Sequence, residues 1–146
     1  MSLQSALEYL QQKMEEVLEN GAGHVFLGRE EFEKEALPQW SIFATNGDLF
    51  SQGMNQCELN ELVSILVEGY FQVSDIRNPL LTLNQKRDEF FNLIKNLLQN
   101  DNSLGGNIFQ LLVSDQDVSS QWFYGSHEED KSIVFFSFGF FFRILS

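Results

Sequence analysis

The sequence predicts a single α+β domain, in which an antiparallel or mixed β-sheet of about four to five strands carries two α-helices on one face. Three observations lead to this prediction. Two stretches repeat apolar residues at helical spacing, several shorter stretches alternate at strand spacing, and the chain finishes with a long strand rich in phenylalanine. A length of 146 residues fits one domain, so residues 1–146 are expected to share one core.

The first helix is expected over residues 3–18, where apolar residues recur at steps of three and four and glutamine and glutamate occupy the opposite side. Asn20-Gly21 then provides a stop signal. A second helix is expected after Asn78-Pro79, because Thr82-Leu-Asn-Gln85 has the spacing of a capping box. Its apolar stripe ends before Asn100-Asp101-Asn102 and contains Phe90, Phe91, Ile94, Leu97 and Leu98.

Strand patterns follow the first helix and flank the second. We expect strands at residues 24–28, 40–45 and 61–73, and another at 108–113 that continues as an irregular edge through 121–124. Asn46-Gly47-Asp48 predicts a turn, residues 29–37 are expected to form a loop, and residues 49–58 a loop or a ragged strand end. Leu104-Gly105-Gly106 predicts a tight reversal, since glycine tolerates positive φ. The polar residues 125–131 predict the tip of a long C-terminal β-hairpin.

The last strand, residues 133–145, is the most apolar segment of the chain. We expect one of its faces to lie under the two helices, namely Val134, Phe136, Phe138, Phe140, Phe142 and Ile144. The other face leaves Phe135 and Phe141 without an evident cover, on either side of Gly139. A long apolar strand without a cover favours pairing with another chain. Phe135, Phe141 and Arg143 are therefore the candidate subunit interface.

The formal net charge of −12 argues against a nucleic-acid backbone binder, which needs clustered lysine and arginine. The first residues lack a basic segment, so we expect no signal peptide. A bilayer-spanning helix takes about 20 apolar residues, whereas residues 133–145 are fewer and include Arg143, so we expect no membrane association. Cys57 is the single cysteine, which leaves no internal disulfide and no zinc site built from thiolates.

Two acidic groups are candidate functional surfaces. Glu30, Glu31 and Glu33 lie in an expected loop, and a second group, Glu128, Glu129 and Asp130, lies at the expected hairpin tip. Such residues ordinarily form solvated surface that maintains solubility. Alternatively, in a ring of several copies, they would line an acidic lumen that repels a nucleic-acid backbone and lets it slide through.

Residues suited to catalysis or metal binding are scarce. The two histidines, His24 and His127, lie beside different predicted elements. Gly105-Gly106 lacks the lysine of a phosphate-binding loop, and the residues after His127 lack the pattern of a calcium loop. We therefore expect no catalytic, cofactor-binding or metal site. An enzyme that uses His127 with its acidic neighbours is the least favoured alternative.

The region from about residue 83 to 144 has a more distinctive layout. A helix with the body Asp88-Glu-Phe-Phe-Asn-Leu-Ile-Lys-Asn-Leu-Leu98 leads through Asn102-Ser-Leu-Gly-Gly106 into a strand and the connection Val113-Ser-Asp-Gln-Asp117. An acidic hairpin tip and a terminal aromatic strand with an arginine near its end follow. This layout resembles the small tail terminator, or tail completion, proteins of bacteriophages and prophages, including those that are minor tail protein U-like.

The resemblance implies a virion structural protein without catalysis. Subunits of this kind assemble as a ring, typically a hexamer, on the last ring of the tail tube, stop its growth and offer a surface to the head–tail connector. The expected partners are other copies of the chain, the tail tube protein and the connector protein. The expected location is the virion tail, after synthesis in the host cytoplasm. From the residues alone, a different class stays open: a domain that holds an apolar small molecule in a phenylalanine-lined pocket.

Overall fold

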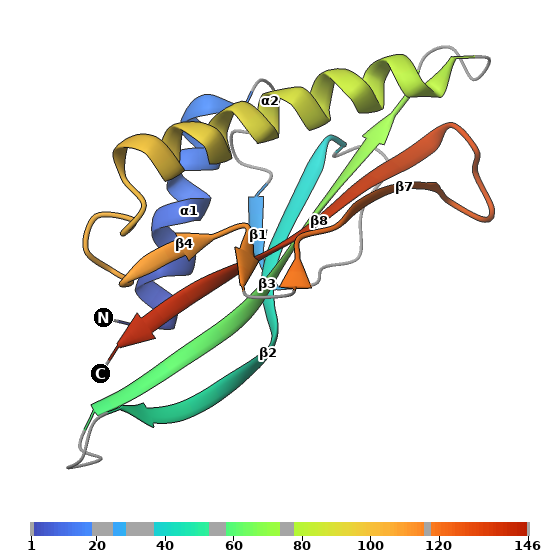
Figure 1. The fold of residues 1–146 in the computed structure, drawn as a ribbon. Helices are drawn as coiled ribbons and strands as arrows, with labels where there is room; N and C mark the ends of the chain where they lie inside the picture. The colour runs from blue at the N-terminus through green and yellow to red at the C-terminus, as the bar shows by residue number, and fades with distance from the viewer. Residues whose placement is uncertain are drawn as a thin grey trace.

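The computed structural model describes residues 2–18, 25–28, 37–52, 58–73, 78–115 and 118–145. A six-stranded mixed sheet carries both helices on one face (Figure 1). The α+β class predicted from the sequence is confirmed, with one more strand than the largest number expected. In chain order the elements are α1 (Leu3–Val17), β1 (Val25–Leu27), β2 (Gln39–Gln52), β3 (Glu58–Gln72), α2 (Pro79–Asn100), β4 (Gln110–Leu112), β5 (Ser114–Asp115), β6 (Val118–Ser119), β7 (Trp122–Ser126) and β8 (Ile133–Leu145).

Strand β8 has partners on both sides. Along one side it is antiparallel to β3 over its whole length, and its other side is shared by β7 and β4. The β7–β8 hairpin confirms the expected C-terminal hairpin. The strands predicted within 108–113 and at 121–124 are present as β4 and β7 on one edge of β8, but their continuity was wrong, because the chain leaves β8 after Leu112, forms the small β5–β6 pair and only then returns as β7. Beyond β3 the order continues to β2 and to β1, which is parallel to β2.

Helix α1 agrees with the sequence pattern. It begins after Ser2, whose Oγ accepts a hydrogen bond from the Ser5 N–H at 3.4 Å, as an N-cap residue does. Its buried residues fall on one stripe, Ala6, Leu7, Leu10 and Met14. The predicted stop at Asn20-Gly21 lies outside the described residues, as do His24, Cys57 and all but the last residue of the loop predicted at 29–37.

Helix α2 begins earlier than predicted. Pro79 occupies its first position, where the missing N–H of proline removes no intrahelical hydrogen bond. Thr82 and Gln85 therefore lie inside the helix, and the predicted capping box was wrong. The predicted end at Asn100 is confirmed. The buried stripe of α2 consists of Leu83, Phe90, Leu93, Ile94 and Leu97.

Strand β2 runs through the predicted turn at Asn46-Gly47-Asp48, so that turn was wrong. Of residues 49–58, predicted to be a loop or a ragged strand end, residues 49–52 form the end of β2. Continuous pairing with β3 satisfies the backbone groups of this stretch better than a local turn would. The register shifts between Ala44 and Asn46, so one extra residue is absorbed as a bulge. The turn signal thus marks a β-bulge in a long hairpin.

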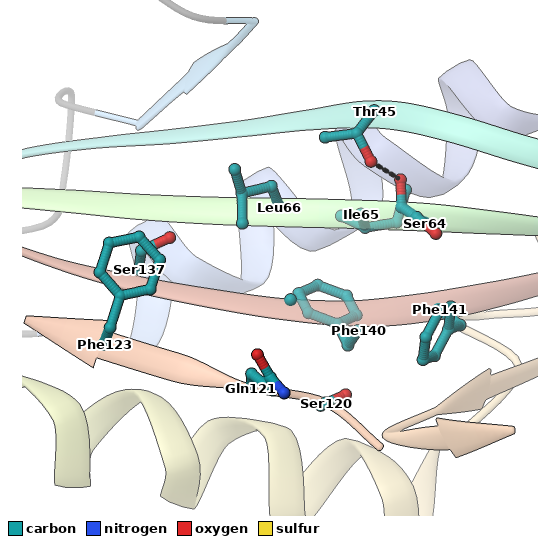
Figure 2. A pocket seen from close by; sticks show the side chains of 11 residues that line it. Thr45, Ser64, Ile65, Leu66, Ser120, Gln121, Phe123, Ser137, Phe140 and Phe141 are labelled. Atoms are coloured by element: carbon teal, nitrogen blue, oxygen red, sulfur yellow. Dashed lines mark hydrogen bonds between the residues drawn. The ribbon is translucent and has the colours of Figure 1, made fainter. Parts of the chain in front are cut away.

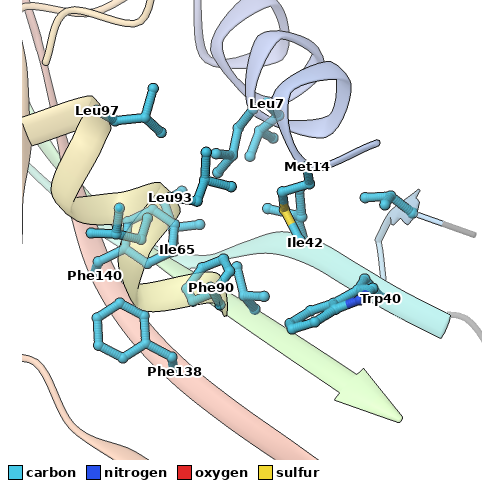
Figure 3. Close-up of a cluster of buried hydrophobic side chains, with 14 of the residues drawn as sticks. Leu7, Met14, Trp40, Ile42, Ile65, Phe90, Leu93, Leu97, Phe138 and Phe140 are labelled. Carbon is cyan, nitrogen blue, oxygen red and sulfur yellow. The ribbon is translucent and has the colours of Figure 1, made fainter. Parts of the chain in front are cut away.

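Packing between the sheet and the helices forms the core (Figure 3). The β8 face expected under the helices is buried, with every member at most 7% exposed. Phe90 of α2 meets Trp40 in a stacked contact with ring centroids 5.6 Å apart. The ring centroids of Phe136, Phe138 and Phe140 lie 6.1, 5.7 and 6.5 Å from that of Phe90. One aromatic ring therefore joins α2 to both β2 and β8.

The Leu-Gly-Gly turn after α2 reverses as predicted, with φ values of 49°, 68° and 84° at Leu104, Gly105 and Gly106. Asp101 holds this turn in place. Its carboxylate accepts a hydrogen bond from the Gly105 N–H at 2.9 Å and another from the Tyr9 hydroxyl of α1. A single carboxylate thus connects α1, the end of α2 and the turn that leads to β4.

Replacing Phe90 by alanine should lower the free energy of unfolding by about 3–5 kcal/mol, because a fully buried ring and its aromatic contacts are lost. Phe109→Ala is the matched control, since that ring is 50% exposed. Urea denaturation followed by circular dichroism measures both variants. Equal effects of the two substitutions would contradict the central place of Phe90.

Replacing Tyr9 by phenylalanine should lower the free energy of unfolding by about 1 kcal/mol at neutral pH. This is the usual contribution of a charge-assisted hydrogen bond at a partly exposed site. The hydrogen bond from Tyr9, followed by that from the Gly105 N–H and the charge of Lys13, lowers the pKa of Asp101 below 3.8. The bond to Asp101 and burial raise the pKa of Tyr9 above 10.0.

The pKa of Asp101 is lower in the folded state, so its contribution is complete above pH 3.8 and disappears as the pH falls through the folded pKa. The pKa of Tyr9 is higher in the folded state, so its contribution is complete below pH 10.0 and disappears at more alkaline pH. The stability difference between the native chain and the variant, measured by thermal unfolding across pH, should therefore be flat near neutrality and shrink at both extremes. A pH-independent difference would contradict this assignment.

Candidate assembly face and sheet edge

The three candidate interface residues lie on the face of the sheet opposite the helices, which we call the open face. Phe135, Phe141 and Arg143 alternate along β8 with the residues buried under the helices, and all three are half-buried. In the register, Phe141 lies opposite Ser64 of β3 and Leu112 of β4. The structure therefore places the predicted residues on one face, at the positions that periodicity gave them.

Phe135 packs against residues of its own chain. Its ring centroid lies 5.4 Å from that of Tyr70 and 6.0 Å from that of Phe123. It also covers Gly125, where a Cβ atom would lie 2.2 Å from the Phe135 Cζ. The sequence analysis left Phe135 and Phe141 without a cover. In the structure, residues of β3 and β7 cover Phe135.

A surface pocket of about 460 Å³ occupies the middle of the open face (Figure 2). Its floor is β8 between Ser137 and Phe141, one wall is β3, and the other wall is the segment that enters β7. The lining residues are Thr45, Ser64, Ile65, Leu66, Ser120, Gln121, Phe123, Ser137, Gly139, Phe140 and Phe141. Phe141 is the only member of the predicted interface that lines this pocket.

The far side of β2 forms a sheet edge. Strand β1 pairs only with Trp40–Ile42, and no other described strand pairs with β2 on that side. Beyond the bulge, β2 and β3 stay paired to the end of their hairpin, which we call the arm and which comprises residues 44–52 and 58–64; β8 accompanies β3 as far as Asn60 (Figure 1). Leu49 and Leu59 lie on the same face of this arm and are 62% and 39% exposed.

Of the acidic candidates, Glu30, Glu31 and Glu33 lie outside the described residues, and the second group lies at the tip of the β7–β8 hairpin. Glu128 and Glu129 are exposed. Asp130 accepts a hydrogen bond from the Ser132 N–H at 3.0 Å and so holds its own turn. Within the described ranges, no three histidine, cysteine, aspartate or glutamate residues gather in a group that would hold a metal ion.

A second pocket, of about 440 Å³, lies between α2 and β7. Phe91, Leu98, Trp122 and Phe138 supply apolar walls. At its rim, the guanidinium of Arg87 lies 4.6 Å from the ring centroid of Phe91 and 4.4 Å from that of Trp122, which is cation–π geometry. This pocket can take an apolar group beside the core.

No model of a known protein family matches this chain, and no curated protein matches it in sequence. The resemblance to tail terminators therefore stays a prediction. Neither of the helices in the described part of the chain has the length and apolar character needed to span a bilayer.

Sequence reasoning missed the arm and the open-face pocket. The exposed Leu49 fell in a segment predicted as a loop or a ragged strand end, so its place on a sheet edge was not specified. Ser137 and Gly139 carried a signal of their own, because they are the small residues in a run of phenylalanines. Ser120 lines the same pocket but had no such signal in the sequence, because only the fold brings it close to Ser137 and Gly139.

Proposed function

We propose that this chain is a non-enzymatic virion assembly subunit of the tail-terminator type, which joins copies of itself into a ring on the tail tube and presents that ring to the head connector. The observation that carries the proposal is the edge of β2, which continues into an arm with exposed leucines. A strand edge offers backbone N–H and C=O groups to a strand of another chain.

The arm has the composition of a contact surface. Leu49 is opposite Glu61 in the register, and Leu59 lies two residues from Glu61 on the same strand. The two leucines lie on the same face of the sheet as the apolar layer that ends on β8 with the buried Ile144, and Glu61 stands between Leu49 and Ile144 in the register. Pairing with another strand would bury this apolar surface as well as satisfy the edge.

The positions of the two sheet edges also suit a ring. The β2 edge and the β7–β4 edge lie on opposite sides of the sheet, so one subunit presents different surfaces to its two neighbours. Such heterologous contacts close into a ring when the rotation between subunits permits. Phe141 and Arg143 lie beside the second of these edges, because β4 pairs with β8 at residues 141–143.

Oligomeric mass tests the proposal. Light scattering and negative-stain imaging should show rings at high protein concentration or after addition of purified tail-tube protein, with the chain at the ends of the tubes. A chain that stays monomeric under all conditions and leaves tube ends bare would contradict it.

Replacing Leu49 by lysine should weaken ring formation at least about tenfold, because a charge at a strand edge opposes edge pairing. The side chain is 62% exposed, so the fold should be unaffected. Leu80→Lys is the matched control, since Leu80 is 54% exposed at the start of α2, away from the edge. Sedimentation velocity measures both variants. An equal loss of assembly in the control would show that added charge, rather than the β2 edge, is responsible.

The second candidate is a domain that binds an apolar small molecule, and the pocket between α2 and β7 favours it. Val113→Trp should fill this pocket and abolish binding of n-octane, whereas Leu81→Trp, at a position 56% exposed, should not. The indole N–H signal of Trp122, observed by NMR, reports occupancy. No change in that signal on titration of the native chain with n-octane would remove this candidate.

A further inference from the structure

Strand β7 has an outer edge that no other described strand pairs with. Just before β7 begins, the Gly139 N–H donates a hydrogen bond to the Gln121 carbonyl oxygen at 3.1 Å, so residue 121 faces β8. Hydrogen-bonded positions alternate along an antiparallel pair. The backbone N–H and C=O groups that point away from β8 are therefore those of Trp122, Tyr124 and Ser126. These groups are free to pair with an added strand.

Helix α2 presents a stripe of apolar and basic residues on the side of this edge. At steps of three and four, the stripe consists of Leu80, Asn84, Arg87, Phe91, Lys95 and Leu98. The Tyr124 hydroxyl donates a hydrogen bond to the Asn84 Oδ1 at 2.9 Å. The ring centroids of Phe91 and Trp122 lie 6.4 Å apart. These contacts place the stripe beside β7, and it carries no carboxylate, although the chain has a net charge of −12.

The sheet does not fully cover this stripe. Leu80 is 54% exposed, Trp122 is 43% exposed, and Phe91 and Leu98 are half-buried. Side chains alternate along a strand, so every second residue of a strand added to β7 would lie on the helix side of the sheet, beside Trp122 and Tyr124. The pocket of about 440 Å³ between α2 and β7 is lined by Trp122 and would take an apolar side chain of that strand.

The cations of the stripe indicate the charge of the partner. Arg87 is held in place, because its guanidinium lies over the rings of Phe91 and Trp122 and its Nη1 lies 3.1 Å from the Asp88 Oδ1. Lys95 is exposed, lines the pocket and has no ion pair with any described residue. A carboxylate on the partner would therefore gain an ion pair with Lys95.

We propose that the outer edge of β7 and the stripe of α2 bind an extended segment of another protein, whose residues facing α2 are apolar with one acidic residue among them. The segment pairs with the backbone of Trp122, Tyr124 and Ser126 as an added strand. One apolar side chain enters the pocket beside Trp122, and the carboxylate pairs with Lys95. The β2 edge takes no part in this binding, which therefore does not rest on the assembly proposed above.

The probe is the peptide acetyl-Thr-Leu-Thr-Glu-Thr-Leu-Thr-amide, which places both leucines and the glutamate on one face of a strand. Its counterpart has lysine in place of glutamate. Titration of the ¹⁵N-labelled full chain with the glutamate peptide should give saturable NMR shifts at Trp122, Tyr124 and Ser126 and slow the exchange of their amide hydrogens. Lys95→Glu should weaken binding of the glutamate peptide about fivefold and reverse the preference between the two peptides.

Ser126→Pro tests the backbone pairing separately from the charge. It removes an N–H that points away from β8, so the sheet loses no hydrogen bond. The preceding residue, Gly125, has no Cβ atom to clash with the proline ring. The substitution should weaken binding of both peptides at least about fivefold and leave the circular dichroism spectrum unchanged. Ser126→Ala is the matched control and should bind both peptides as the native chain does.

The proposal is overturned if the glutamate peptide causes no saturable shift at the three β7 residues, or if Lys95→Glu leaves the preference between the peptides unchanged. It is also overturned if Ser126→Pro binds both peptides as tightly as Ser126→Ala does. A loss of self-association in that proline variant would then assign the edge to a contact between copies of the chain. Leu49→Lys, which targets the β2 edge, should leave peptide binding unchanged, so a failure of ring formation is read separately.

Discussion

The contact of Phe90 with the rings of β8 fixes the arrangement of the rest of the molecule. Because a strand places alternate residues on one face, one ring on α2 reaches Phe136, Phe138 and Phe140 and so sets the position of the helix along β8. The same ring stacks on Trp40, whose indole N–H has no partner among the described residues. Aromatic packing, rather than hydrogen bonding, thus holds β2 against α2, and it assigns one whole face of the sheet to the helices.

Strand β8 has two unlike faces. Every alternate residue under the helices is large, apolar and buried. On the open face, Ser137 and Gly139 stand between Phe135 and Phe141, so small residues form a depression with a ring at each end. The ring of Phe135 packs against Gly125 of β7. This contact holds the Phe135 end of the depression against β7.

Periodicity within a single segment was enough to predict both helices and the buried face of β8, and two consecutive glycines were enough to predict the reversal at Leu104. It failed where distant residues decide the structure. The turn signal at Asn46-Gly47-Asp48 lost to pairing with β3, and nothing local indicated that two separate strands would share one edge of β8. The open-face pocket was beyond prediction for the same reason, since Ser64 and Ser120 reach it from different elements.

If the chain assembles as proposed, its charge and the composition of its β2 edge together favour assembly on a template. Two copies that each carry a formal charge of −12 repel one another, although salt screens that repulsion beyond about 8 Å at physiological ionic strength. The edge itself contributes little to it, because Asp48 is the one acidic residue of β2. Long-range repulsion therefore opposes encounters between free subunits. In the proposed assembly, a tube end that held subunits side by side would raise their effective concentration and offset this repulsion without changing the contact at the edge.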